Sequence, residues 1–245
     1  DNTIQLIDEG NTIPFISRYR KEVTGELNDE VLRTFEERLN YLRNMEERKD
    51  DIKRIIEEQG KLTEELSAQI DNAQKLSELE DIYRPFRPKR RTRATVAKEK
   101  GLEPLSNILY LQNLTNGDID EIAAPFVDEE KGVNNTEEAL AGAMDIIAEA
   151  VSDNAEHRKK IRELTEKNGL LVSKAATEED SVYRLYYDFA EPVAKAVPHR
   201  VLAIDRGEKE KLLSVSVDVD EEKIISYLKK REITNRASIT ASYVE

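Results

Sequence analysis

The sequence contains no cysteine and no tryptophan, and aromatic residues make up only 6% of its 245 positions. Without cysteine, a disulfide framework, a thiolate zinc site and a cysteine nucleophile are excluded. The same absence fits a reducing compartment, so we expect a cytoplasmic protein. With so few aromatic residues, the core must consist mainly of Leu, Ile, Val and Ala side chains, which favours helices packed against helices.

Long apolar runs and glycine clusters are also missing. No stretch approaches the roughly 18 apolar residues that a membrane-spanning helix needs, so we expect no membrane partner. The nine glycines are dispersed, and neither the Gly-x-Gly-x-x-Gly pattern nor the Gly-x-x-x-x-Gly-Lys-Ser/Thr loop occurs. These absences exclude the common nucleotide-binding motifs, and we expect no cofactor.

Candidates for catalysis or metal binding are few. His157 and His199 are the only histidines, and they lie too far apart to form a metal-ligand pair by local spacing. His157 stands among charged residues, which predicts a solvated helix face, and His199 follows a proline at a helix start, which favours capping or packing. The acidic residues 118–121 lack the glycine and the distal glutamate of a calcium loop. We therefore predict a protein that is not an enzyme and has no metal site.

The charge balance restricts contact with nucleic acid. Charged residues make up 36% of the chain and the formal net charge is −13. Because a uniformly acidic surface repels phosphates, binding of nucleic acid requires a local basic patch.

The larger basic patch lies beside Tyr83 and Phe86. Its Arg and Lys side chains can neutralise phosphates, and aromatic rings can stack on bases. The same cations can instead pair with the surplus carboxylates of the chain or solvate a linker. All three interpretations remain open from the sequence. The patch comprises Arg84, Arg87, Lys89, Arg90, Arg91 and Arg93.

A smaller patch contains Arg18, Arg20 and Lys21 on the first short helix, which we expect at residues 13–23. Gly25 separates this helix from a long one, and that order of elements occurs in helix-turn-helix units. Such helix pairs are common in all-helical proteins, so the order alone does not specify a DNA-binding role.

Apolar residues at spacings of three and four predict helices along most of the chain. The clearest begins after Asn28 as N-cap and ends at Gly60. Its charged middle, residues 45–51, is expected to be exposed on most sides between two packed regions. Further N-caps are expected at Thr63, Thr136 and Ser152. Residues 89–95 read as an extended basic stretch, and Gly207 is expected to end a helix that begins at Pro198.

Two segments predict strands. Residues 170–175 are short and apolar, and residues 212–219 alternate apolar and polar side chains, so the two can pair as an antiparallel ribbon. The basic, proline-containing residues 84–95 form the expected seam between a part at 1–88 with the long helix and a part at 89–245 with the ribbon. The predicted fold is mainly α and multi-helical, with a helix-turn-helix-like portion and a small two-stranded β element.

Several strings of residues are distinctive. Residues 6–25 read LIDEGNTIPFISRYRKEVTG, residues 79–83 read LEDIY, and residues 87–94 read RPKRRTRA. Together with YDF at 187–189, PHR at 198–200 and RGE at 206–208, they resemble the N-terminal region of the bacterial Tex family of transcription accessory proteins. The resemblance implies a longer protein whose downstream parts include an RNase H-like YqgF domain, helix-hairpin-helix motifs and an OB-fold RNA-binding domain, none of which lies in this chain.

The resemblance implies a function for this region as well. We expect a non-enzymatic helical scaffold that positions the downstream nucleic-acid-binding domains, which would bind most of the RNA or DNA, while the basic residues add a contact of their own. The alternative is a protein-interaction module for the transcription machinery, which the acidic residues 178–180 and the charged middle of the long helix suggest. Because the chain begins at Asp1 and ends at Glu245 in mid-pattern, we expect a piece of a longer protein.

Overall fold

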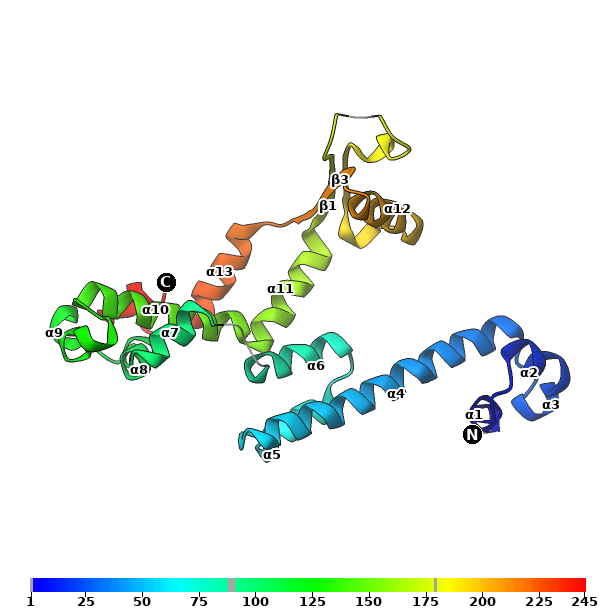
Figure 1. The fold of residues 1–245 in the computed structure, drawn as a ribbon, viewed down its shortest axis with the longest axis horizontal. Coiled ribbons are helices and arrows are strands. Elements are labelled where there is room, and N and C mark those ends of the chain that lie inside the picture. Colours follow the sequence, from blue (N-terminus) through cyan, green and yellow to red (C-terminus); the bar gives the residue numbers. More distant parts are fainter. Residues whose placement is uncertain (1, 88–90, 179) are drawn as a thin grey trace. The chain divides into compact units, whose positions relative to one another are not determined.

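The computed structural model describes residues 2–87, 91–178 and 180–245. The chain divides into two compact units, Asp1–Phe86 and Arg87–Glu245. The described residues form thirteen α-helices, short 3₁₀ turns and one three-stranded sheet (Figure 1), so the predicted mainly α class is confirmed. The expected boundary between residues 88 and 89 lies outside the described residues. The 3₁₀ turns are η1 (Arg84–Phe86), η2 (Ala124–Phe126), η3 (Glu129–Lys131), η4 (Arg184–Tyr186), η5 (Val193–Lys195) and η6 (Ala241–Tyr243).

In the first unit, short helices pack near the start of a long helix. They are α1 (Asn2–Asp8), α2 (Ile13–Tyr19) and α3 (Lys21–Thr24), and the long helix is α4 (Asp29–Glu58). The helix expected at residues 13–23 is therefore two helices, because the backbone at Arg20 leaves the helical region with φ −133° and ψ 23°.

A tight turn then leads from α3 into α4. Gly25 has φ 70°, a left-handed conformation that glycine adopts at little cost. The side chain of Asn28 accepts a hydrogen bond from the Val31 amide at 2.9 Å, which confirms the predicted cap. The succession of short helix, turn and long helix gives the helix-turn-helix-like portion.

The helix α4 joins two separate cores. At its start Leu32 packs with Ile13 and Ile16 of α2, and in its second half Ile52 and Ile56 pack against the next two helices. Those helices are α5 (Glu64–Asn72), capped by Thr63 as predicted, and α6 (Leu76–Tyr83). At about 1.5 Å per residue, its 30 residues measure about 45 Å.

The exposed part of α4 is not where the sequence placed it. None of residues 33–44 is buried, whereas Met45 and Lys49, inside the charged middle, are buried. Lys49 Nζ donates to Glu46 Oε1 at 2.8 Å and to the Asp71 carbonyl oxygen at 2.9 Å. Because these partners compensate its charge, a lysine lies within the packed face, and the expectation of exposure on most sides was wrong there.

The second unit begins with a helical core. It contains α7 (Arg93–Glu99), α8 (Glu103–Leu111), α9 (Ile119–Ala123) and α10 (Thr136–Asp153). The helix α7 occupies residues that the sequence suggested were extended. Thr92 caps it by accepting the Thr95 amide at 3.0 Å, and Ala94 and Ala97 are buried in the core shared with α10.

Two predicted caps were wrong by one or two residues. Asn135 caps α10 by accepting the Glu138 amide at 2.8 Å, while the neighbouring Thr136 hydroxyl donates to Asp120 at 2.8 Å. Asn154, not Ser152, caps α11 (Ala155–Asn168). Asn, Ser and Thr have similar cap preferences, so local sequence does not choose between such neighbours.

The helix α11 leads into the sheet, whose order is β2-β1-β3 with both pairs antiparallel. The strands are β1 (Leu170–Ala175), β2 (Asp188–Pro192) and β3 (Leu213–Asp218). The predicted pairing of β1 with β3 is confirmed, with Ser173 opposite Val215. The sequence missed β2, whose residues DFAEP contain little apolar alternation. Its edge position suits the proline, which cannot donate to a ladder.

Two helices flank the third strand. The helix α12 (Pro198–Lys209) packs on β3 and continues through Gly207, which was wrongly expected to end it. A Cβ at Gly207 would lie 2.6 Å from Leu213 Cδ1, so this glycine permits close approach of helix and strand. The helix α13 (Glu221–Glu232) then leads back from the sheet to contact α11 (Figure 1). No described helix combines the length and apolarity needed to cross a membrane.

Candidate nucleic-acid interface

The larger basic patch of the sequence is divided between the two units. Arg84 lies in η1 at the end of the first unit, and Arg87 is the first residue of the second. Lys89 and Arg90 lie outside the described residues.

The last two cations of this patch pair with carboxylates of the second unit. Arg91 Nη2 lies 2.8 Å from Glu99 Oε2, and Arg93 Nη2 lies 3.3 Å from Asp145 Oδ1. The two arginine side chains are 70% and 88% exposed, so these pairs are weak. A carboxylate beside each guanidinium nevertheless reduces the positive potential that a phosphate would meet.

The smaller patch is brought together at the junction of two short helices. Arg18 lies in the last turn of α2, Arg20 stands at the break, and Lys21 begins α3; these three residues are hereafter the α2–α3 basic cluster. All three are exposed, and within the described part of the chain none forms an ion pair with a carboxylate. Glu22, which follows Lys21 in the first turn of α3, is the nearest acidic residue in sequence.

Local helix stability accounts for only part of this cluster. Arg18 and Lys21 lie in the last turns of α2 and α3, where the helix dipole favours cations. Arg20 is the N-cap residue of α3 without a side-chain cap bond, whereas caps favour Asn, Asp, Ser or Thr. A residue that contradicts local preference in this way is expected at a functional surface.

Two aromatic rings lie beside the cluster. The Phe15 and Tyr19 ring centroids are 5.3 Å apart with an interplanar angle of 44°, and the Arg20 guanidinium carbon lies 5.5 Å from the Phe15 centroid. Tyr19 is 65% exposed. Sequence reasoning missed Tyr19 as a candidate residue, although its spacing of four from Phe15, with cations on either side, was a visible signal.

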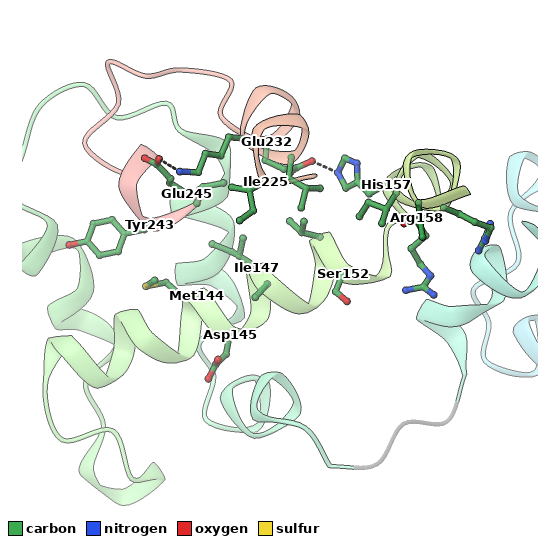
Figure 2. Close-up of a pocket in the computed structure, with 18 residues that line it drawn as sticks. Met144, Asp145, Ile147, Ser152, His157, Arg158, Ile225, Glu232, Tyr243 and Glu245 are labelled. Carbon is green, nitrogen blue, oxygen red and sulfur yellow. Dashed lines mark hydrogen bonds and ion pairs between the residues drawn. The ribbon is translucent and has the colours of Figure 1, made fainter. Parts of the chain in front are cut away.

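A separate feature of the second unit is an apolar groove of about 850 Å³ between α10, α11, α13 and the residues around η6. Figure 2 shows Ile147 from α10 and Ile225 from α13 facing each other across it. At one end Lys229 Nζ pairs with Glu245 Oε1 at 2.5 Å. The remaining apolar lining consists of Met144, Ala148, Val151, Ile161, Leu228 and Val244.

His157 closes the other end of this groove and is buried, so its expected solvated position was wrong. Its Nε2 hydrogen-bonds Glu232 Oε1 (Figure 2), and its Nδ1 lies 3.1 Å from the Tyr227 hydroxyl. Both partners belong to α13, which covers the first turn of α11. Both ring nitrogens are occupied, so the arrangement indicates a packing role. His199 is exposed in the first turn of α12.

Glu232 also holds the end of α8. Tyr110 Oη donates to its Oε2 at 2.6 Å, and Gln112 Nε2 donates to its main-chain carbonyl oxygen at 2.7 Å. The hydrogen bond from Tyr110 to this carboxylate, together with burial, raises the pKa of the Tyr110 phenol to about 12. Within the described residues, no group of three or more His, Asp or Glu side chains is arranged to hold a metal ion.

Comparison with known proteins gives two family matches. The model described as "Tex-like protein N-terminal domain" matches residues 1–57, which include the α2–α3 basic cluster. The model described as "Tex central region-like" matches residues 115–243, which include most of the apolar groove.

Relatives cover nearly the whole of this chain. It is 46% identical over 243 residues to "Uncharacterized protein YdcI" of Bacillus subtilis, covering 97% of this chain and 34% of that protein. It is 41% identical to "Transcriptional accessory protein Tex" of Neisseria gonorrhoeae over 218 residues, 87% of this chain and 28% of that protein. It is 29% identical to "S1 RNA-binding domain-containing protein 1" of Homo sapiens over 230 residues, which cover 90% of this chain and 23% of that protein. The chain thus spans about a third or less of each relative.

Proposed function

Because this chain belongs to the Tex family, we propose that it is a non-enzymatic, cytoplasmic scaffold of a transcription accessory protein that contacts nucleic acid through the α2–α3 basic cluster. Most RNA or DNA binding would belong to downstream domains of the longer protein. The name of the human relative, which includes an S1 RNA-binding domain, supports RNA binding by the longer protein.

The observation that supports the nucleic-acid contact is the lack of carboxylate partners for the α2–α3 basic cluster among the described residues. The chain has a net charge of −13, yet Arg18, Arg20 and Lys21 are exposed and lack a carboxylate partner among the described residues. Unpaired, exposed cations can neutralise phosphates and release their counterions, which is the main source of affinity for a nucleic-acid backbone. Arg91 and Arg93, by contrast, already have carboxylate neighbours. We therefore assign the main contact of this chain to the smaller patch.

The long helix supports a scaffold role. The two cores on α4 are separated by residues 33–44, none of which is buried. A continuous helix keeps the α2–α3 basic cluster at a fixed distance from the second core of its unit. The names of the relatives describe accessory or RNA-binding proteins and give no reaction, and His157 is engaged on both ring nitrogens.

Binding of the 245-residue chain to labelled single-stranded RNA and duplex DNA at low salt tests the contact. We expect the Arg18→Ala/Arg20→Ala/Lys21→Ala variant to bind at least about tenfold more weakly than the parent chain. A matched control, Arg33→Ala/Arg54→Ala/Lys131→Ala, removes the same charge from exposed residues that pair with carboxylates. Equal weakening by the control, or no binding by the parent chain, would overturn the assignment.

The apolar groove favours a second candidate function, a protein-interaction module for the transcription machinery. Met144 and Ile225 on its walls are 41% and 48% exposed, as expected of a surface that a partner covers. Retention of RNA polymerase from a bacterial lysate by the parent chain, and its loss with Met144→Asp/Ile225→Asp, would support this candidate. Failure to retain polymerase would count against it.

A further inference from the structure

We propose that the α2–α3 basic cluster selects single-stranded nucleic acid, with an unpaired base stacked on the ring of Tyr19. This inference rests on the proposed phosphate contact, and it adds a residue and a substrate class to the same surface. Phosphate contact alone explains the three cations, but it gives no reason for an exposed aromatic ring among them.

Tyr19 has the geometry of a stacking residue. Its ring belongs to a residue that is 65% exposed, and its hydroxyl has no hydrogen-bond partner among the described residues. The Arg20 guanidinium lies over Phe15, whose ring packs against Tyr19, so a nucleotide stacked on the Tyr19 ring would bring a phosphate near Arg20. Base–aromatic stacking of this kind is tolerant of sequence because every base presents a π face.

Neighbouring side chains hold the ring in place. Arg20 lies over Phe15, and Phe15 in turn packs against Tyr19 at 5.3 Å between centroids. Phe15 is partly buried, so this small stack is anchored to the body of α2. A ring that is already ordered loses less conformational entropy when a ligand binds, which improves affinity.

The local backbone favours a single strand over a duplex. A recognition helix that reads the major groove must be continuous across several base pairs. Here α2 has only seven residues, about 10 Å at about 1.5 Å per residue, and it breaks at Arg20. In a duplex the bases are stacked on each other, so none is free to cover Tyr19. An unpaired strand offers both its phosphates and its base faces.

Variants at Tyr19 separate stacking from charge. We expect Tyr19→Ala and Tyr19→Leu to weaken binding of oligouridine RNA or oligothymidine DNA by about tenfold. Tyr19→Phe should bind like the parent chain, because it retains the ring. Binding of duplex DNA should be the same for all four proteins. Because Tyr19 is largely exposed, these replacements leave the fold intact, and circular dichroism spectra check this.

A crosslinking measurement locates the contact. Irradiation of the chain with a bromouracil-substituted single strand should form an adduct at Tyr19, identified by mass spectrometry of the digested protein. The Arg18→Ala/Arg20→Ala/Lys21→Ala variant should lose this adduct. Comparison of a uridine strand with a deoxyuridine strand shows whether the surface distinguishes RNA from DNA, which requires a contact to the 2′-hydroxyl.

The outcomes distinguish this inference from the proposed function. Weaker single-strand binding by Tyr19→Ala and Tyr19→Leu, with duplex binding unchanged, supports the stacking site. Unchanged single-strand binding by these variants, while the triple alanine variant loses affinity, overturns stacking and leaves the phosphate contact in place. Absence of binding by the parent chain overturns both.

Discussion

His157 and Glu232 lie 75 residues apart in the sequence and form a hydrogen bond in a buried setting, with side chains only 7% and 10% exposed. One belongs to the first turn of α11 and the other to the last turn of α13. Glu232 also accepts the Tyr110 hydroxyl from α8. The Glu232 carboxylate therefore links α13, α11 and α8 by hydrogen bonds where the chain returns from the sheet.

The His157–Glu232 pair should contribute to stability in a non-additive way. We expect His157→Ala and Glu232→Ala each to lower the free energy of unfolding by about 2–4 kcal/mol, because one variant leaves Glu232 Oε1 and the other leaves His157 Nε2 without its hydrogen-bond partner in a buried setting. The double variant should lose less than the sum, with a coupling of about 1–3 kcal/mol in urea unfolding. The exposed pair Lys160–Glu163 on the same helix serves as the control. Its coupling should stay below about 1 kcal/mol, and additive losses at His157 and Glu232 would contradict the role of the buried pair.

Tyr110 should lose its phenol proton at a higher pH than an ordinary tyrosine. Its hydrogen bond to Glu232 raises the pKa of the folded phenol to about 12. A raised pKa means that the protonated form is favoured in the folded state. The resulting stabilisation is complete below the unfolded pKa near 10 and is lost as the pH rises toward 12. Ultraviolet absorbance of tyrosinate should show a component at high pH that becomes smaller by one tyrosine in Tyr110→Phe. A part should remain, because desolvation and the hydrogen bond to Glu210 also raise the pKa of Tyr183. An unchanged component in the variant would contradict the assignment.

Gly207 should tolerate a larger side chain only when Leu213, which packs against it, is replaced by a smaller residue. Replacing a helical glycine by alanine normally stabilises a helix by about 1 kcal/mol. Here a Cβ would lie 2.6 Å from Leu213 Cδ1 and 3.1 Å from Tyr183 Cγ. We expect Gly207→Ala to destabilise the chain by about 1–3 kcal/mol instead. In a Leu213→Ala background the same change should cost less or stabilise, and an unchanged cost would show that this contact is not responsible.

The two arginines at the start of α7 should matter less for nucleic-acid binding than the α2–α3 basic cluster. Arg91→Ala/Arg93→Ala removes two positive charges that already face Glu99 and Asp145. The Arg18→Ala/Lys21→Ala variant removes the same charge from residues without a carboxylate partner in the described chain. Titration of a labelled single strand with both variants should show the larger loss of affinity for the second. A larger loss of affinity for Arg91→Ala/Arg93→Ala would indicate that the larger patch makes the main contact.

Features with local causes were predictable from the sequence. Asn28 and Thr63 cap helices as expected, since each is followed by acidic residues and an apolar pattern of helical period. The pairing of β1 with β3 was also predictable, because both strands are apolar and bounded by turns. The family was evident from the long strings at residues 6–25 and 79–94.

Features with distant causes were not predictable. His157 lies among charged neighbours in sequence, and only the return of α13 buries it. Gly207 has the local signature of a helix end, whereas its reason is the close approach of Leu213. The helix α7 begins in a basic stretch that looks extended until Ala94 and Ala97 are seen in the core with α10.

The candidate interface shows the same division. The sequence identified both groups of cations, and it favoured the larger group for its number of cations and for Tyr83 and Phe86 beside it. We propose the smaller group instead, because carboxylates distant in sequence determine the local potential: Asp145 of α10 faces Arg93, while no described carboxylate pairs with Arg18, Arg20 or Lys21. Ion pairing between distant elements depends on the fold, so the number of charged residues in a segment does not predict it.

Salt dependence of single-strand binding tests the α2–α3 basic cluster most directly. The slope of log affinity against log salt changes by about 0.7 for each phosphate contact to a single strand. We therefore predict that Arg18→Ala/Arg20→Ala/Lys21→Ala has a slope smaller by about 2 than the parent chain. The control Arg33→Ala/Arg54→Ala/Lys131→Ala should keep the parent slope. Equal slopes for the parent chain and the Arg18→Ala/Arg20→Ala/Lys21→Ala variant would contradict a phosphate contact at this cluster.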